Sequence, residues 1–153
     1  MSDGLLEEDL PLPAIRQKPF LALGIGCERG CSAEEIITLA VAVLAEAGFT
    51  PDAVSTVASI ELKRDEPGIL ALASALRAPV RFFPAERLLA ETEHLSERSA
   101  LVFRATGCWG VAEAAALAAC GCGAALVASK RRSRRATCAI ARASRQFDAG
   151  APA

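Results

Sequence analysis

The residue types best suited to bind a charged ligand lie in a glycine-rich segment near the start of the chain, FLALGIGCERGCSAEEII at 20–37. Its apolar part is typical of a buried strand that ends at Gly24, followed by a loop with Gly26 and Gly30 and by a helix capped by Ser32. Glycines let a backbone approach a ligand closely, and the unpaired amides of a helix's first turn favour anions. This segment therefore predicts a loop that faces an anionic ligand.

A second segment has the same local arrangement with a different sequence. The glycine loop TGCWG at 106–110 lies between an expected strand end at 101–103 and an alanine-rich, apolar helix at 111–120. Ligands of open α/β sheets bind beyond the carboxyl ends of parallel strands, where the two loops would converge. The loops supply the candidate ligand-binding residues Gly24, Gly26, Gly30, Ser32, Thr106, Gly107 and Gly110. The alternative is that these glycines only allow tight turns and close packing.

A charged run, ELKRDEPG at 61–68, follows a predicted strand and should lie along the same edge of the sheet. Lys63 could pair with a ligand carboxylate, and Glu66 or Glu61 could accept a proton if burial raised its pKa. Lys63 and Glu66 are therefore the candidates for acid-base chemistry, and Lys63 is also a candidate for binding. A solvated charged loop is the alternative meaning of such a run.

The densest basic patch is KRRSRR at 130–135, which we expect at the tip of a hairpin. Lys130, at its start, is a further ligand-binding candidate, because the patch could guide an anionic ligand or a partner enzyme toward the site. A solvated turn is the alternative. No aromatic residues are interleaved with these bases, which argues against nucleic-acid binding.

The cysteines predict thiols and no metal site. Cys27 and Cys31 are four residues apart and Cys120 and Cys122 two apart, and neither spacing is that of a structural zinc site. Cys27 is a ligand-binding candidate, because a thiol in a loop before a helix can have a lowered pKa. The single histidine, His94, lies in an unrelated polar stretch, which argues against a Cys-His nucleophile.

Two residues around the second loop have a structural and a functional interpretation. Trp109 could stack on a flat ligand, although an isolated tryptophan commonly lies in the core. Glu113, near the start of an apolar helix, is explained by the favourable interaction of a carboxylate with the positive end of the helix dipole.

Apolar spacing and turn residues predict the elements that position these residues. Helices are expected at 34–47, from Pro67 through 76, at 85–89 and at 111–120, and strands at 54–60, 80–83, 124–128 and 136–141. The stretch at 91–99 is expected to be a loop. Strands that alternate with helices before a final hairpin predict a single three-layer α/β/α domain with a mixed, mostly parallel sheet. Its expected span is 19–143, with flexible tails at 1–18 and 144–153.

Composition excludes several classes of protein. A chain of 153 residues with 52 % hydrophobic and 23 % charged residues can bury the core of one domain. Its net charge of -1 gives no general reason to expect nucleic-acid or membrane binding. The acidic start at 1–18 is unlike a signal peptide, and no apolar run reaches about 18 residues, so we expect a cytoplasmic protein.

Five pieces of the chain, in order, resemble the cobalamin-biosynthesis family of CobE and the C-terminal domain of CbiG. They are GIGCERGCSAEEI, ASIELKRDEPGILALA, VRFFPAERL, GVAEAAALAA and LVASK, which together extend over about 20–143. A single glycine loop is a weak signal, but the order of all five identifies the chain as similar to this family.

The resemblance implies a role in building the corrin ring, whose intermediates are large tetrapyrroles edged with carboxylates. We expect the chain to bind such a precorrin or corrinoid at the two glycine loops, with no cofactor. In the CbiG family the full protein opens a lactone on a cobalt-containing precorrin and releases acetaldehyde, and this chain has room only for the C-terminal domain. Two alternatives stay open: a hydrolase-like enzyme that uses Lys63 or Glu66, and a non-catalytic carrier or partner of other corrin-pathway enzymes.

Overall fold

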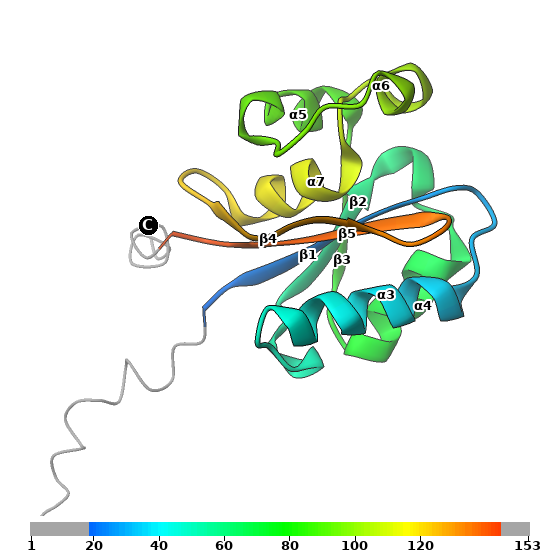
Figure 1. Ribbon diagram of the computed structural model, residues 1–153, viewed down its shortest axis with the longest axis vertical. Helices are drawn as coiled ribbons and strands as arrows, with labels where there is room; N and C mark the ends of the chain where they lie inside the picture. Colours follow the sequence, from blue (N-terminus) through cyan, green and yellow to red (C-terminus); the bar gives the residue numbers. More distant parts are fainter. Residues whose placement is uncertain (1–18, 145–153) are drawn as a thin grey trace, which may run out of the picture.

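The computed structural model describes residues 19–144, which form a five-stranded mixed sheet with helices on both faces (Figure 1). The strand order is β3-β2-β1-β5-β4. The strands are β1 Leu21–Cys27, β2 Thr56–Ile60, β3 Val80–Phe83, β4 Ala125–Arg132 and β5 Ala136–Arg142. The pairs β1–β2 and β2–β3 are parallel, and β5 runs antiparallel to both β1 and β4. Four strands therefore point the same way, and the predicted α/β class is confirmed. The expected tails lie outside the described residues, apart from Ser144.

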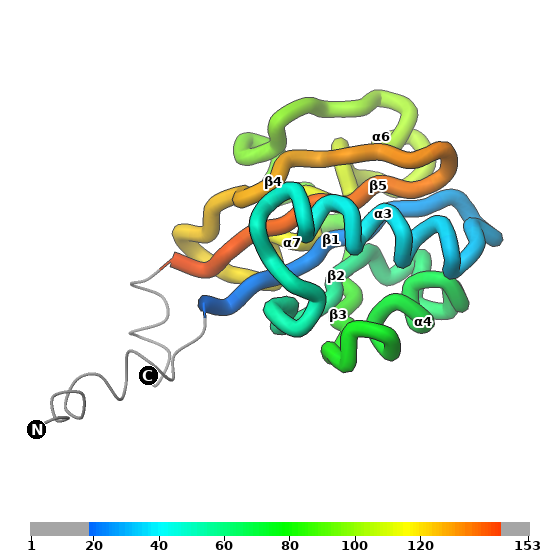
Figure 2. The backbone as a smooth tube through the Cα atoms, turned by 60° about the horizontal axis from the view of Figure 1, so that its bottom comes forward, coloured from blue at the N-terminus to red at the C-terminus, as the bar shows by residue number. Residues whose placement is uncertain are grey.

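Helices cover the two faces of the sheet in separate layers (Figures 1 and 2). One layer consists of α3 (Ala33–Glu46) and α4 (Pro67–Leu76). The other consists of α5 (Ala85–Leu89), α6 (Ala100–Thr106) and α7 (Val111–Cys120). Short 3-10 turns at Pro51–Ala53, Glu61–Lys63 and Thr92–His94 complete the chain. The middle turn, η2, follows β2 directly.

Alternation along β1 divides the core into two clusters. The large side chains of Leu21, Leu23 and Ile25 pack with α3 and α4, while Ala22 belongs to a second cluster with the alanines of α7. The α7 layer is the tighter one. A Cβ added to Gly24 would lie 1.9 Å from the carbonyl oxygen of Ala112, which places α7 almost in contact with the strand backbone.

This packing corrects the prediction that β1 ends at Gly24. The strand continues to Cys27, so Gly24 and Gly26 lie inside it and not in a loop. A Cβ on Gly26 would lie 2.8 Å from Thr137 Oγ1 and 3.3 Å from Val111 Cβ. At these two positions glycine allows close approach of protein elements, which is the alternative that the sequence left open.

Two further expectations about local structure were wrong. The segment at 101–103 is part of α6, because Ser99 Oγ accepts the amide of Val102 and Gly107, at φ 88°, ends the helix. The basic patch is not all turn, because β4 extends to Arg132, opposite Thr137. The hairpin turn is therefore limited to Ser133–Arg135, and Lys130 lies in the strand.

Within the described residues, no single helix has both the length and the apolar composition needed to cross a membrane. The pair α6 and α7 reaches those values only when the two are taken together, and it is bent by 69°. Every residue of α7 is buried in this fold.

Candidate functional site

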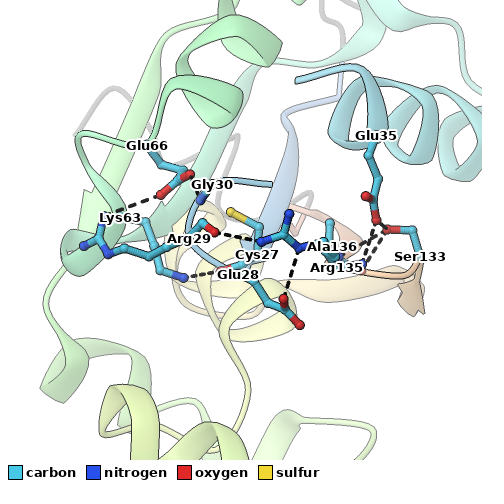
Figure 3. A network of polar contacts seen from close by, with 10 residues as sticks. All are labelled: Cys27, Glu28, Arg29, Gly30, Glu35, Lys63, Glu66, Ser133, Arg135 and Ala136. Carbon is cyan, nitrogen blue, oxygen red and sulfur yellow. Dashed lines mark hydrogen bonds and ion pairs between the residues drawn. The ribbon is translucent and has the colours of Figure 1, made fainter. Parts of the chain in front are cut away.

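The end of the sheet at which β1 and β2 finish brings together most of the predicted residues of the first loop and the charged run. The loop at 28–32, the turn η2 and the tip of the β4–β5 hairpin meet there, beside the start of α3 (Figure 3). Because β5 is antiparallel to β1, its first residue, Ala136, pairs with Cys27. The hairpin tip therefore lies next to the first loop, although about a hundred residues separate them in sequence.

Glu66 is the buried centre of this cluster. Its residue is only 2 % exposed, and its carboxylate accepts the Gly30 amide at 2.7 Å and lies 3.5 Å from the guanidinium of Arg29. Gly30 itself adopts φ 80°, a conformation that favours glycine. The Gly30 amide, expected to face a ligand, is thus bound by the protein. A buried carboxylate needs such partners, so Glu66 holds the first loop in place.

Lys63 and Cys27 are neighbours, and their contacts are structural. Lys63 Nζ donates to the carbonyl of Cys27, and the lysine is half-buried. Burial raises the pKa of the Cys27 thiol to about 11, with Lys63 opposing the rise and Glu66 adding to it. Cys27 is therefore a protonated thiol at neutral pH, which argues against a nucleophilic role.

Two arginines fasten the loop to its neighbours. Arg29, whose side chain is 60 % exposed, donates to the carbonyl of Leu62 at 2.5 Å and pairs with Asp65 at 3.3 Å. Arg135 pairs with Glu28 at 3.1 Å and donates to the carbonyl of Arg29 at 2.9 Å. These contacts connect η2, the loop at 28–32 and the hairpin tip into one surface, on which Glu28, Asp65 and Glu66 lie among the bases. We call it the cationic rim after its six basic side chains, Arg29, Lys63, Arg64, Arg132, Arg134 and Arg135. Sequence analysis did not single out Arg29 or Glu28, whose partners lie far away in sequence.

The start of α3 is also tied to the hairpin. Ser32 Oγ accepts the Glu35 amide at 3.1 Å, as the capping pattern predicts. The Glu35 carboxylate does not complete a capping box, because it accepts Ser133 Oγ at 2.5 Å and the Arg135 amide at 2.6 Å. These hydrogen bonds lower the pKa of Glu35.

The second glycine loop reaches the same end of the sheet on the opposite face. Val111, the first residue of α7, packs next to Gly26, so α7 and α3 both begin at this end with the sheet between them. The polar groups of this loop form hydrogen bonds within the loop and with α6. Thr106 Oγ1 donates to the carbonyl of Val102 at 2.7 Å, and the Gly107 amide donates to Phe103 at 2.8 Å. The two loops therefore share an edge and do not line one hollow.

Glu113 is a second buried carboxylate whose partners lie far away in sequence. It is 3 % exposed and accepts three hydrogen bonds, from the amide and hydroxyl of Ser96 at 2.8 and 2.6 Å and from the Lys130 amide at 2.7 Å. Lys130 Nζ in turn pairs with Glu97 at 3.2 Å. Glu113 thus does more than complement the helix dipole, because it joins the segment before α6 to strand β4.

Trp109 and His94 both have partners within the protein. Trp109 stacks on Phe103, with ring centroids 4.4 Å apart and an interplanar angle of 21°. His94 is exposed, with Nδ1 3.2 Å from Glu91, and lies away from Cys27 in another turn. Within residues 19–144 no group of three or more histidine, cysteine or acidic side chains is arranged to hold a metal ion.

A hollow beside this rim lies along α3. It has a volume of about 480 Å³ and is lined by Ser32, Glu34, Glu35, Thr38, Leu39, Ala42 and Ser133. Of the predicted binding residues it includes only Ser32. This hollow is therefore separate from most of the predicted binding residues.

The comparisons with known proteins agree with this fold and show the family. A family model described as "Cobalamin synthesis G C-terminus" matches residues 21–141. The chain belongs to this family. It is 46 % identical over 121 residues to "Protein CobE" of Sinorhizobium sp, and the match covers 79 % of each chain. The crystal structure of CobE, described as a protein of the cobalamin biosynthetic pathway, matches with a TM-score of 0.79 and 42 % identity over 90 % of this chain and 97 % of that one.

A second kind of relative in the cobalamin synthesis G family is much longer. The chain is 39 % identical over 97 residues to "Cobalt-precorrin-5A hydrolase" of Priestia megaterium, a match that covers 63 % of this chain and 25 % of the hydrolase. The chain thus corresponds to most of a CobE protein and to one quarter of that hydrolase. The predicted family is confirmed, and it makes this chain a cobalamin-biosynthesis protein.

Proposed function

We propose that this cobalamin-biosynthesis protein binds a carboxylate-rich tetrapyrrole intermediate at the cationic rim. The observation that carries the proposal is a set of unpaired cations: Arg64, Arg132 and Arg134 follow η2 or lie near the hairpin tip, and none makes an ion pair within residues 19–144. Corrin intermediates carry several acetate and propionate groups, which arginine binds well through paired hydrogen bonds. Lys63, Arg29 and Arg135 hold the segments of the rim together through their hydrogen bonds.

A direct titration tests this function. Wild-type protein should bind hydrogenobyrinic acid with Kd below about 100 μM, which is a free energy of about -5.5 kcal/mol, as read by calorimetry or a spectral shift. The double variant R132Q/R134Q should weaken binding about tenfold or more, because two charge-assisted contacts are lost. Arg142→Gln, at the far end of β5, is the matched control and should bind as the wild type does. No binding by wild-type protein would contradict the proposal for this ligand.

A hydrolase-like reaction is the second candidate, and the similarity to cobalt-precorrin-5A hydrolases favours it. The two acid-base candidates, Lys63 and Glu66, are both hydrogen-bonded to backbone groups of the first loop, which supports a binding role for this region over proton transfer. Incubation with a lactone-bearing precorrin, followed by mass spectrometry, separates the two functions. An unchanged ligand mass supports binding alone, and loss of a two-carbon fragment supports hydrolysis.

A carrier that passes intermediates to other corrin-pathway enzymes is compatible with binding without catalysis. Its partner would be a biosynthetic enzyme of the same pathway, and we expect the exchange to occur in the cytoplasm. A pull-down with the full chain as bait tests this, and recovery of no pathway methyltransferase or other pathway enzyme would count against a carrier.

A further inference from the structure

The helix α6 lies at the same end of the molecule as the start of α3 and the hairpin tip (Figure 1). None of its seven residues is buried. Among the large apolar residues of 19–144, Leu101 has the highest exposure, 70 %, and Phe103 is 36 % exposed, while Val102 packs against the core cluster of α7. Scattered exposed leucines are ordinary, but Leu101 and Phe103 together give this short helix a small apolar surface that can contact a ligand.

The structure holds this exposed helix in one position. Ser99 Oγ caps its start, the Ser99 amide donates to the Trp109 carbonyl at 2.9 Å, and Phe103 stacks on Trp109. The preceding segment is anchored through Ser96 to the buried Glu113. Interactions at both ends of α6 therefore keep an apolar surface turned outward, as a preorganised binding surface requires.

The charge on α6 indicates what kind of molecule covers it. Arg104 follows Leu101 by three residues, so the two lie on neighbouring positions of the helix, and Arg104 is exposed with no ion pair within residues 19–144. An exposed leucine beside an unpaired guanidinium is complementary to a flat apolar ring with carboxylates at its edge. A seven-residue helix is only about 10 Å long, which is too short by itself for the roughly 800 Å² per partner of a stable protein interface.

We propose that α6 is a second wall of the tetrapyrrole site, in which Leu101 contacts the apolar face of the macrocycle and Arg104 binds one of its carboxylates. This inference rests on the proposed function and adds a contact that the glycine loops and the cationic rim do not supply. The macrocycle would then be held by charge on the rim and by apolar contact on α6.

Ligand binding by variants of Leu101 and Arg104 tests whether α6 contacts the tetrapyrrole. Trp109 is the single tryptophan of the chain and stacks on Phe103 of this helix, so its fluorescence reports ligand binding nearby. In titrations with hydrogenobyrinic acid, Leu101→Ser and Arg104→Gln should each raise Kd about fivefold or more, because one removes apolar contact and the other an ion pair. Leu70→Ser, a 41 % exposed leucine on α4, and Arg142→Gln are the matched controls and should leave Kd unchanged.

The outcomes distinguish the inference from the function it rests on. If the wild-type protein binds the ligand and the α6 variants bind it equally well, α6 does not contact the ligand, and the proposal of binding at the cationic rim still stands. No binding by wild-type protein overturns both. If Leu101→Ser instead abolishes a concentration-dependent dimer in sedimentation without changing Kd, α6 is an interface between copies and the proposal is wrong. Unaltered circular dichroism of each variant shows that it is folded.

Discussion

Two buried glutamates have the same anchoring role beneath different surfaces: Glu66 holds the first glycine loop, and Glu113 holds the segment before α6. Each lies at or near the start of a helix and accepts amides from a segment distant in sequence. Glu66 forms an ion pair with the exposed Arg29, and many charged side chains lie on the surface around it. Glu113 accepts only uncharged donors, and the segment that it anchors continues into an apolar helix. The comparison suggests that one ligand meets charge on one side and apolar contact on the other.

The largest expected effect is a loss of stability that tests how closely α7 packs on β1. Gly24→Ala should destabilise the protein by about 4 kcal/mol or prevent folding, because its Cβ would lie 1.9 Å from the Ala112 carbonyl oxygen and α7 would have to move. Gly48→Ala is the control. That position has φ 87° but open space around it, so only backbone strain of about 1–2 kcal/mol is expected. Urea unfolding measures both, and equal losses would contradict the tight packing.

The next effect concerns Glu113. Glu113→Ala should lower the free energy of unfolding by about 3 kcal/mol, because the hydroxyl and amide of Ser96 and the Lys130 amide lose their buried acceptor. Glu34→Ala, in the exposed first turn of α3, should change it by about 0.5 kcal/mol at most. Chemical denaturation provides the comparison. A small loss for Glu113→Ala would mean that these hydrogen bonds are replaced by water.

Glu66→Ala should have a smaller effect on stability, about 1–2 kcal/mol, because Arg29 is 60 % exposed and can be hydrated once its partner is removed. The same variant frees the first loop and should weaken tetrapyrrole binding more than Glu113→Ala does. Unfolding and binding measured on both variants would sharpen the comparison. If Glu66→Ala lowers the free energy of unfolding more than Glu113→Ala does, the proposed difference between the two glutamates is wrong.

The smallest effect is a pH dependence from Glu35. Its pKa is lowered in the folded state, first by the Ser133 hydroxyl and then by the Arg135 amide, so its contribution to stability is present above its ordinary pKa of 4.5. That contribution is lost as pH falls through the lower, folded value. The stability difference between wild type and Glu35→Gln should therefore shrink on acidification below about pH 4.5, as thermal unfolding at several pH values would show. A constant difference would rule out this linkage.

Local sequence signals predicted most of the elements. The Ser32 cap, Pro67 at the start of α4 and the β-branched run of β2 are short-range features, and the structure confirms each. The helix α6 was missed although its own signals, Ser99 before it and Gly107 after it, are present in the sequence. Apolar residues at 101–103 fit a strand equally well over so short a run.

The site was predictable only in part, because its contacts are non-local. The charged run was expected along the edge of the sheet near the first loop, and the structure places it there, whereas the basic patch was expected only at a hairpin tip. What a glycine approaches cannot be read from its neighbours in sequence, so Gly24 and Gly26 were assigned to a loop when they face α7. The partners of Glu66 and Glu113 lie 36 and 17 residues away, beyond any helical or strand period.

The reversed direction of β5 has a consequence for how ligand preference can change. It places Ser133–Arg135 at the end of the sheet where we propose that the ligand binds, and these three residues belong to neither core cluster. Substitution or lengthening of three residues there would reshape the rim without repacking the interior. Related proteins that handle different intermediates can thus differ at this hairpin turn and keep the same scaffold.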